Sequence, residues 1–275
     1  MSEPLPPLKR LPTVAWRGGA QARSVRALPE EVAVALTYER ATFAVMMASP
    51  ADLEDFAIGF SMAEGIITRP DEITDFQIVQ VEAGIECRMA LTPQRRTALA
   101  DRRRRITGPV GCGLCGLDSL QEAARPSPVV QSALRLSAQA IADAAARLPR
   151  LQRLNQETKA VHAAAFFNPS KPDILLREDI GRHNALDKLA GAVARRGDSS
   201  ANGVVFLTSR VSLDLIQKTA ALGVPVLVAI SVPTARAVRE AEAAGITLLA
   251  VARDDGFEIF THPQRVIFGA ESDVA

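Results

Sequence analysis

Apolar positions in the second half of the chain alternate between short continuous runs and helical spacing. The runs predict buried strands, and the spaced positions predict amphipathic helices. This alternation predicts a largely parallel sheet with helices on both faces. The expected order is strands 161–167 and 174–176, helix 182–195, strand 203–208, helix 213–222, strand 226–230, helix 235–244 and strand 247–252. An earlier helix is expected to begin after Ser137 as its N-cap and to end at Pro149.

The first half has shorter elements. Two pairs of apolar runs predict β-hairpins, 32–38 with 42–47 and 76–81 with 85–91. Between them, apolar residues recur at helical spacing after Asp52, which we expect to be the N-cap of a helix. The proline-containing residues 1–14 predict a disordered lead-in. We therefore expect an α+β domain over 15–127 and an α/β domain over 128–275.

In open α/β sheets, ligands bind beyond the carboxyl ends of the strands. In this chain the rule points to the loops 208–210, 231–233 and 253–256, which are rich in Ser, Arg and Asp. We expect these loops to line a binding site.

Composition excludes several classes of protein. With 32 basic and 31 acidic residues, the chain has no strong field to attract nucleic acid. No apolar run is long enough to span a membrane. The N-terminus lacks the apolar core of a signal peptide, and three cysteines with one close pair do not form a disulfide framework. A cytoplasmic protein that binds neither nucleic acid nor membrane is expected.

Cys112 and Cys115 form a CxxC pair surrounded by Gly111, Gly113 and Gly116. Glycine permits unusual backbone angles, so the segment is expected to be a mobile loop. The preceding arginines, between residues 95 and 105, favour the nucleophilic thiolate by electrostatics. Such a pair can carry sulfur as a persulfide, bind a metal or cycle as a disulfide.

Metal binding and disulfide cycling are the two alternatives to sulfur carriage. A closed zinc site needs four ligands, and the chain has no second CxxC; Cys87 with a histidine could complete a set, but no spacing indicates it. A zinc-stabilised binding module therefore stays the first rival, and a redox chaperone the second. Zinc deamination is disfavoured because no histidine starts an H-x-E motif. We expect no metal site, and we expect Cys87 to be a buried apolar residue.

A polar segment, residues 177–188, joins a predicted strand to a predicted helix. Its sequence is REDIGRHNALDK, and the backbone N–H groups of a helix start bind anions. Arg182, His183 and Asn184 can offer hydrogen bonds to a phosphate or a base edge. The alternative is a capped helix with ordinary surface charges.

The glycine-flanked CxxC, the segment from Glu178 to Lys188 and the tail Phe257-Glu258-Ile259-Phe260-Thr261-His262-Pro263 together resemble the FdhD/NarQ family of formate dehydrogenase accessory sulfurtransferases. The string GRHNALDK is the most specific of the three. The resemblance covers nearly the whole chain after the first dozen residues.

The resemblance implies a sulfurtransferase with a persulfide intermediate. A cysteine desulfurase would load sulfur on Cys112, assisted by Cys115, and the sulfur would pass to the molybdenum bis(molybdopterin guanine dinucleotide) substrate of formate dehydrogenase maturation. The implied cofactor-binding residues are Val251, Ala252, Arg253, Asp254, Asp255 and Gly256, with His183. A ligand like guanosine diphosphate is expected to bind there. The resemblance also implies a homodimer and a cytidine-deaminase-like second domain without zinc.

Overall fold

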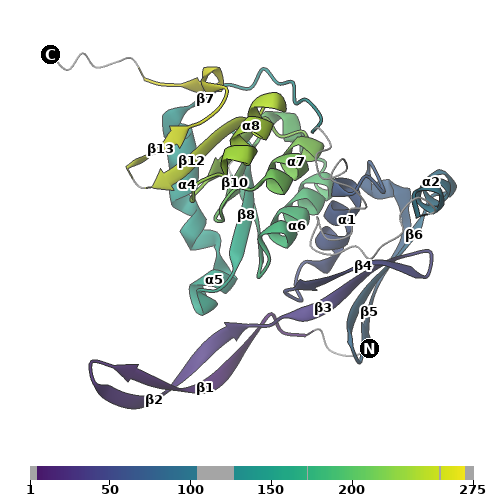
Figure 1. Cartoon of the computed structure of the whole chain (residues 1–275), viewed down its shortest axis with the longest axis vertical. Coiled ribbons are helices and arrows are strands. Elements are labelled where there is room, and N and C mark those ends of the chain that lie inside the picture. Colours follow the sequence, from purple (N-terminus) through teal and green to yellow (C-terminus); the bar gives the residue numbers. More distant parts are fainter. Residues whose placement is uncertain (1–4, 104–126, 172, 254, 270–275) are drawn as a thin grey trace.

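The computed structural model describes residues 5–103, 127–171, 173–253 and 255–269. Within them the chain forms a six-stranded sheet, a four-stranded sheet and two small two-stranded sheets (Figure 1). This is a mixed α/β architecture, as the hydrophobic pattern predicts.

The six-stranded sheet has the order β13-β12-β11-β10-β8-β9. Its strands are β8 (His162–Phe167), β9 (Ile174–Asp179), β10 (Val204–Leu207), β11 (Val226–Ala229), β12 (Thr247–Arg253) and β13 (Gly256–Ile259). Only the pairs β10–β11 and β11–β12 are parallel, whereas β8 pairs antiparallel with both of its neighbours and β13 with β12. The expectation of a largely parallel sheet is therefore confirmed only in part: β9, β10, β11 and β12 run in one direction, and β8 and β13 run in the other. Apolar runs encode burial but not strand direction, and short connections after β8 and β12 turn the chain back.

Helices cover both faces of this sheet, as predicted. One face packs against α6 (Arg182–Arg195), α7 (Leu213–Leu222) and α8 (Ala235–Ala243), and the other against α4 (Ala138–Leu151). The short α5 (Arg153–Thr158) follows α4. Ser137 caps α4 by accepting a hydrogen bond from the Ala140 amide, as expected. Pro149 lies inside α4 instead of ending it, because the last turn continues to Leu151.

The four-stranded sheet has the order β4-β3-β6-β5. It contains both predicted hairpins, β3 (Val32–Tyr38) with β4 (Ala41–Ala48) and β5 (Ile73–Val81) with β6 (Gly84–Leu91). Its inner face packs on α1 (Leu53–Ala63) in an apolar core. Helix α2 (Pro93–Arg103) follows β6, so the first arginines of the basic segment lie on a helix. Short 3-10 helices lie at Pro70–Glu72, Ser200–Asn202 and Pro263–Arg265, and β7 (Leu136–Ser137) pairs with β14 (Val266–Ile267).

Asp52 is the N-cap residue of α1, as predicted, although its φ of 53° is left-handed and its side chain makes no capping hydrogen bond. Its carboxylate pairs with Arg177 instead. The expected disordered lead-in is wrong for its last part. Residues Leu8–Arg17 form strand β1, which pairs antiparallel with β2 (Ala20–Pro29) in a projecting ribbon.

Helices α1 and α6 cross with their backbones in contact. A Cβ atom on Gly59 would lie 1.7 Å from the Asp187 carbonyl oxygen, and one on Gly191 would lie 2.0 Å from that of Asp55. Glycine at both positions is therefore required for this crossing. The crossing fixes the four-stranded sheet and α1 against the six-stranded sheet.

Candidate functional site

The carboxyl ends of β9, β10, β11 and β12 lie at one edge of the six-stranded sheet, because these four strands run in the same direction. Helices α6, α7 and α8 begin at this edge. No side chain caps the start of α6 or α7 in the described part of the chain, whereas Thr234 caps α8. Uncapped N–H groups and the helix dipole make such an edge suitable for an anion.

The three predicted loops do meet there. Val211, after β10, forms a parallel bridge with Pro233, after β11. The Val251 amide in β12 donates to the Ser231 carbonyl, and the Arg253 guanidinium donates to the Ile230 carbonyl. The loops after β10, β11 and β12 therefore form one continuous rim.

His183 occupies the first turn of α6, where its Nε2 atom contacts the Asp214 carboxylate in the first turn of α7. Both side chains are largely buried. Burial would raise the pKa of Asp214, but hydrogen bonding and the charge of His183 outweigh it and hold that pKa at about 2. Asp214 is therefore a carboxylate at neutral pH, and it fixes the imidazole ring at the rim.

His162 and Arg182 complete a cluster of nitrogen groups beside His183. Burial lowers the pKa of His162, and the positive charges of Arg182 and His183 lower it further, so His162 is neutral at neutral pH. The Nε atom of Arg182 is buried and has no hydrogen-bond partner among the described residues. A buried guanidinium nitrogen without a partner is costly unless a ligand supplies an acceptor.

The implied cofactor-binding residues lie at the other end of the rim from His183. Val251, Ala252 and the exposed Arg253 end β12, Asp255 precedes β13, and β13 begins at Gly256; Asp254 lies outside the described residues. β9 and β12 are four strand spacings apart in the sheet, about 19 Å. The structure therefore places both predicted groups on one edge without bringing them into contact.

Val251 has an unusual backbone for its residue type. Its φ is 55°, where β-branched residues are rare, and the pairing of β12 with β13 is irregular between Ala250 and Arg253. Such strain clusters at ligand sites. This observation favours the β12 end as part of the site.

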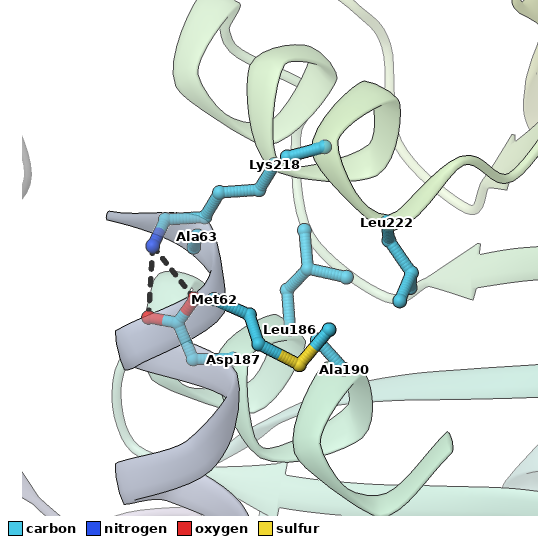
Figure 2. Close-up of a pocket in the computed structure, with 8 residues that line it drawn as sticks. Met62, Ala63, Leu186, Asp187, Ala190, Lys218 and Leu222 are labelled. Carbon is cyan, nitrogen blue, oxygen red and sulfur yellow. Dashed lines mark hydrogen bonds and ion pairs between the residues drawn. The ribbon is translucent and has the colours of Figure 1, made fainter. Parts of the chain in front are cut away.

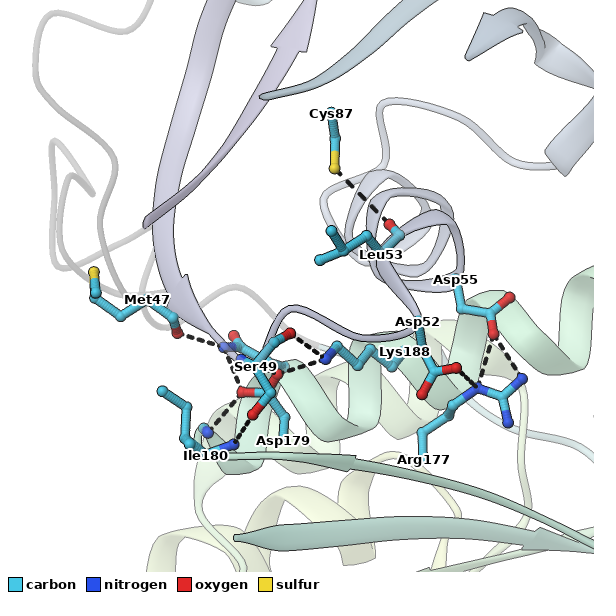
Figure 3. Close-up of polar contacts among 12 residues, drawn as sticks. Met47, Ser49, Asp52, Leu53, Asp55, Cys87, Arg177, Asp179, Ile180 and Lys188 are labelled. Carbon is cyan, nitrogen blue, oxygen red and sulfur yellow. Dashed lines mark hydrogen bonds and ion pairs between the residues drawn. The ribbon is translucent and has the colours of Figure 1, made fainter. Parts of the chain in front are cut away.

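Most of the specific string GRHNALDK has a structural role. Asp179, which ends β9, accepts hydrogen bonds from the amides of Ser49 and Gly181 and from the side chain of Asn184. Lys188 pairs with Asp179 at 2.7 Å and donates to the Ser49 carbonyl (Figure 3). This buried network joins the end of β4 to the start of α6, so the string holds the two sheets together.

A second buried ion pair involves Asp187, the residue just before Lys188 on α6. Lys218 of α7 contacts both oxygens of Asp187 at 2.6 and 2.9 Å. The pair borders a small pocket with Met62, Leu186 and Leu222 (Figure 2). Asp187 and Lys218 therefore act in packing α6 against α7, beneath the rim.

Cys87 belongs to the apolar core of the four-stranded sheet, as predicted. It is fully buried, and burial raises the pKa of its thiol to about 12. Cys112 and Cys115 lie outside the described residues.

Sequence reasoning missed Asp214 and His162 as members of the site. Asp214 has only a weak signal, an acid in the first turn of a helix, and His162 only its place at the start of an apolar strand. Both become neighbours of His183 through packing.

The fold defines the chain as a mixed α/β protein with a cation-bearing strand edge. The model of the FdhD/NarQ family matches residues 29–267, most of the chain. The protein belongs to the FdhD/NarQ family.

Curated relatives agree with this assignment, and one solved structure shares the fold. The chain is 50% identical over 260 residues to a protein of Agrobacterium fabrum named sulfur carrier protein FdhD, covering 94% of this chain and 96% of that one. The Cupriavidus necator protein of the same name is 46% identical, covering 91% and 87%. The crystal structure of a protein from Desulfotalea psychrophila, described as a formate dehydrogenase accessory protein, matches with a TM-score of 0.72 at 22% identity, over 95% of this chain and 100% of that one. At that identity the likeness supports the fold alone.

Proposed function

We propose that this protein is a cytoplasmic sulfurtransferase that carries sulfur for the maturation of formate dehydrogenase. The observation that carries the proposal is the near full-length similarity to relatives named sulfur carrier proteins, at about half identity. The CxxC pair supplies the chemistry that such a carrier needs.

In the loading step, the Cys112 thiolate attacks the outer sulfur of a persulfide on a cysteine desulfurase. The sulfur–sulfur bond of the donor breaks and the donor cysteine leaves as a thiolate. Cys112 then holds the sulfur as its own persulfide.

Delivery requires two electrons, because the carried sulfur leaves as sulfide. A thiolate at Cys115 supplies them by attacking the inner sulfur of the Cys112 persulfide. A disulfide forms between Cys112 and Cys115 and sulfide passes to the acceptor. A cellular dithiol then reduces the disulfide for the next cycle.

The acceptor is the molybdenum bis(molybdopterin guanine dinucleotide) substrate, whose phosphates and guanines suit the rim. The buried Arg182 Nε atom and the uncapped starts of α6 and α7 favour phosphate. The β12 end, from Val251 to Gly256, lies about 19 Å away. An elongated ligand with two nucleotides can contact both ends of this rim.

The loading step is tested by mass spectrometry after incubation with a cysteine desulfurase and cysteine. Wild type and Cys87→Ala are expected to gain the mass of one sulfur, and Cys112→Ala is expected not to. Cys115→Ala is expected to load sulfur but to retain it. A persulfide on Cys112→Ala would contradict the assignment. If wild type instead contains bound zinc, and Cys115→Ala both loses the zinc and unfolds, the zinc-stabilised binding module would be favoured.

The rim is tested by heating the protein with guanosine diphosphate. A ligand at a hundredfold excess over its Kd is expected to raise Tm by about 5 °C. Arg182→Ala and His183→Ala should lose this protection, whereas Arg150→Ala, on the exposed side of α4, should keep it. A redox chaperone or a zinc module does not predict any protection. We also propose that the protein acts as a homodimer.

A further inference from the structure

The β1–β2 ribbon projects from the body (Figure 1), and its exposed side chains form an apolar stripe. Directly opposed residues of an antiparallel pair lie on one face, so Pro12 with Val25, Val14 with Arg23, and Trp16 with Gln21 share a face. Val14, Trp16 and Val25 are 64%, 74% and 63% exposed. We refer to this face, with Pro12, Val14, Trp16, Arg23 and Val25, as the ribbon face.

Only the base of the ribbon is tied to the body. Arg10 pairs with Glu157 of α5 at 2.5 Å, and Arg26 donates to the Thr158 carbonyl. Within the described residues, no hydrogen bond or ion pair joins residues 12–25 to the body. A two-stranded hairpin alone is marginally stable in water. The distal ribbon therefore needs a surface that covers its apolar face.

The charge of the ribbon indicates what kind of surface covers its apolar face. Residues 8–29 contain five basic residues and no acidic one, whereas the rest of the chain has 27 basic and 31 acidic residues. Two ribbons would repel each other, but a ribbon and the body of another copy carry opposite net charge.

We propose that the ribbon face docks on the body of a second copy of this chain, and that the second copy docks its own ribbon in return. This proposal names the surface that makes the homodimer proposed above. A reciprocal exchange closes as a two-fold dimer, because each copy both gives and receives one ribbon.

The size of the ribbon is sufficient for such a dimer. Ten residues per strand extend about 33 Å, and two strands cover a width of about 10 Å. Counting two ribbons and the two surfaces that they cover, the contact buries about 1,300 Å². This area is at the lower end of stable interfaces.

Trp16 is the only tryptophan of the chain, so its fluorescence reports on the ribbon alone. The full-length protein is measured at a series of dilutions, by sedimentation and by acrylamide quenching. A dimer is expected in which Trp16 emission is shifted to the blue and shielded from acrylamide. Dilution to monomer should expose Trp16, and salt should weaken the dimer because the docking is partly electrostatic.

Val14→Glu removes an apolar contact and adds a negative charge to the basic ribbon. It is expected to weaken dimerisation by about tenfold or more, because apolar anchors dominate interfaces. Val129→Glu, at a residue that is 66% exposed outside the ribbon, is the matched control and should leave the dimer intact. Far-ultraviolet circular dichroism should be the same for both variants.

Three results would overturn the proposal. A dimer that persists in Val14→Glu with Trp16 still shielded would refute the ribbon contact and leave the homodimer standing. A wild type that is monomeric at every concentration would refute both. Shielding of Trp16 only on addition of anionic vesicles or of formate dehydrogenase would assign the ribbon to that partner. None of these readouts depends on sulfur transfer, so they separate this proposal from the proposed activity.

Discussion

The ammonium group of Lys188 lies 2.7 Å from the carboxylate of Asp179, and both side chains are fully buried. Asp179 ends β9 and Lys188 lies on α6, yet both also bind Ser49 at the end of β4. The pair therefore belongs to the joint between the two sheets and supports the rim from below. Arg182 and His183, between them in sequence, reach the rim.

Lys188→Met tests this structural role. The change leaves the Asp179 carboxylate buried without its cation, so it is expected to lower the free energy of unfolding by about 3–5 kcal/mol. The control Arg69→Met breaks an ion pair with Asp71 that is mostly exposed, and it should cost less than about 1 kcal/mol. Urea unfolding measures both. Equal losses of unfolding free energy in the two variants would show that the buried pair stabilises the protein no more than the exposed pair does.

The crossing of α1 and α6 gives a second prediction. Gly59→Ala and Gly191→Ala each place a methyl group against a backbone carbonyl oxygen, at 1.7 and 2.0 Å. The helices must separate, and each variant is expected to lose about 3 kcal/mol of stability. Gly269→Ala, which meets nothing within 4 Å, is the control and should be neutral. A Gly59→Ala variant as stable as wild type would mean that the helices slide apart at little cost.

The elements that the sequence predicts best are those with one buried face. Both bounds of α6 and α7 match the apolar spacing, since burial of one helix face follows directly from that spacing. β9 extends past the predicted end to Asp179, through Arg177 and Glu178. Charged residues look like the end of a strand, but here Arg177 pairs with Asp55 and Glu178 accepts from the amides of α5.

The site is predictable only in part, because some of its contacts follow from strand topology and others depend on how the helices pack. Loops after parallel strands share an edge by topology, so their meeting could be predicted. The partner of His183 could not, because it depends on how α6 packs on α7. The same holds for the contact of Lys188 with Ser49, which lies 139 residues earlier in the chain, just after β4.

The pair of His183 and Asp214 predicts a pH dependence. The pKa of Asp214 is about 2 in the folded protein against an ordinary aspartate value of 3.8, so the stabilisation is present above pH 3.8 and is lost as the pH falls toward 2. Asp214→Asn should therefore lower the free energy of unfolding by about 2 kcal/mol at neutral pH, and the difference from wild type should vanish in acid. Urea unfolding at several pH values measures this. A difference that does not change with pH would mean that Asp214 acts through packing and not through its charge.

The left-handed backbone at Val251 predicts the relative stabilities of its glycine and alanine variants. Its left-handed φ of 55° is unfavourable for any residue with a Cβ atom, and glycine adopts it freely. Val251→Gly is therefore expected to be more stable than Val251→Ala by about 1 kcal/mol. At Val228, a buried residue of the regular strand β11, the order should be reversed, because glycine in a strand is less stable than alanine by about 0.5–1 kcal/mol.

The same Val251 variants test whether the strained β12 end serves the rim. If the strain positions the loop for a nucleotide, Val251→Gly should be more stable than Val251→Ala but should lose much of the thermal protection by guanosine diphosphate, since the relaxed backbone no longer fixes the loop. The Val228 variants, corrected for their lower stability, should keep that protection. Full protection of Val251→Gly would place the nucleotide at the His183 end of the rim alone.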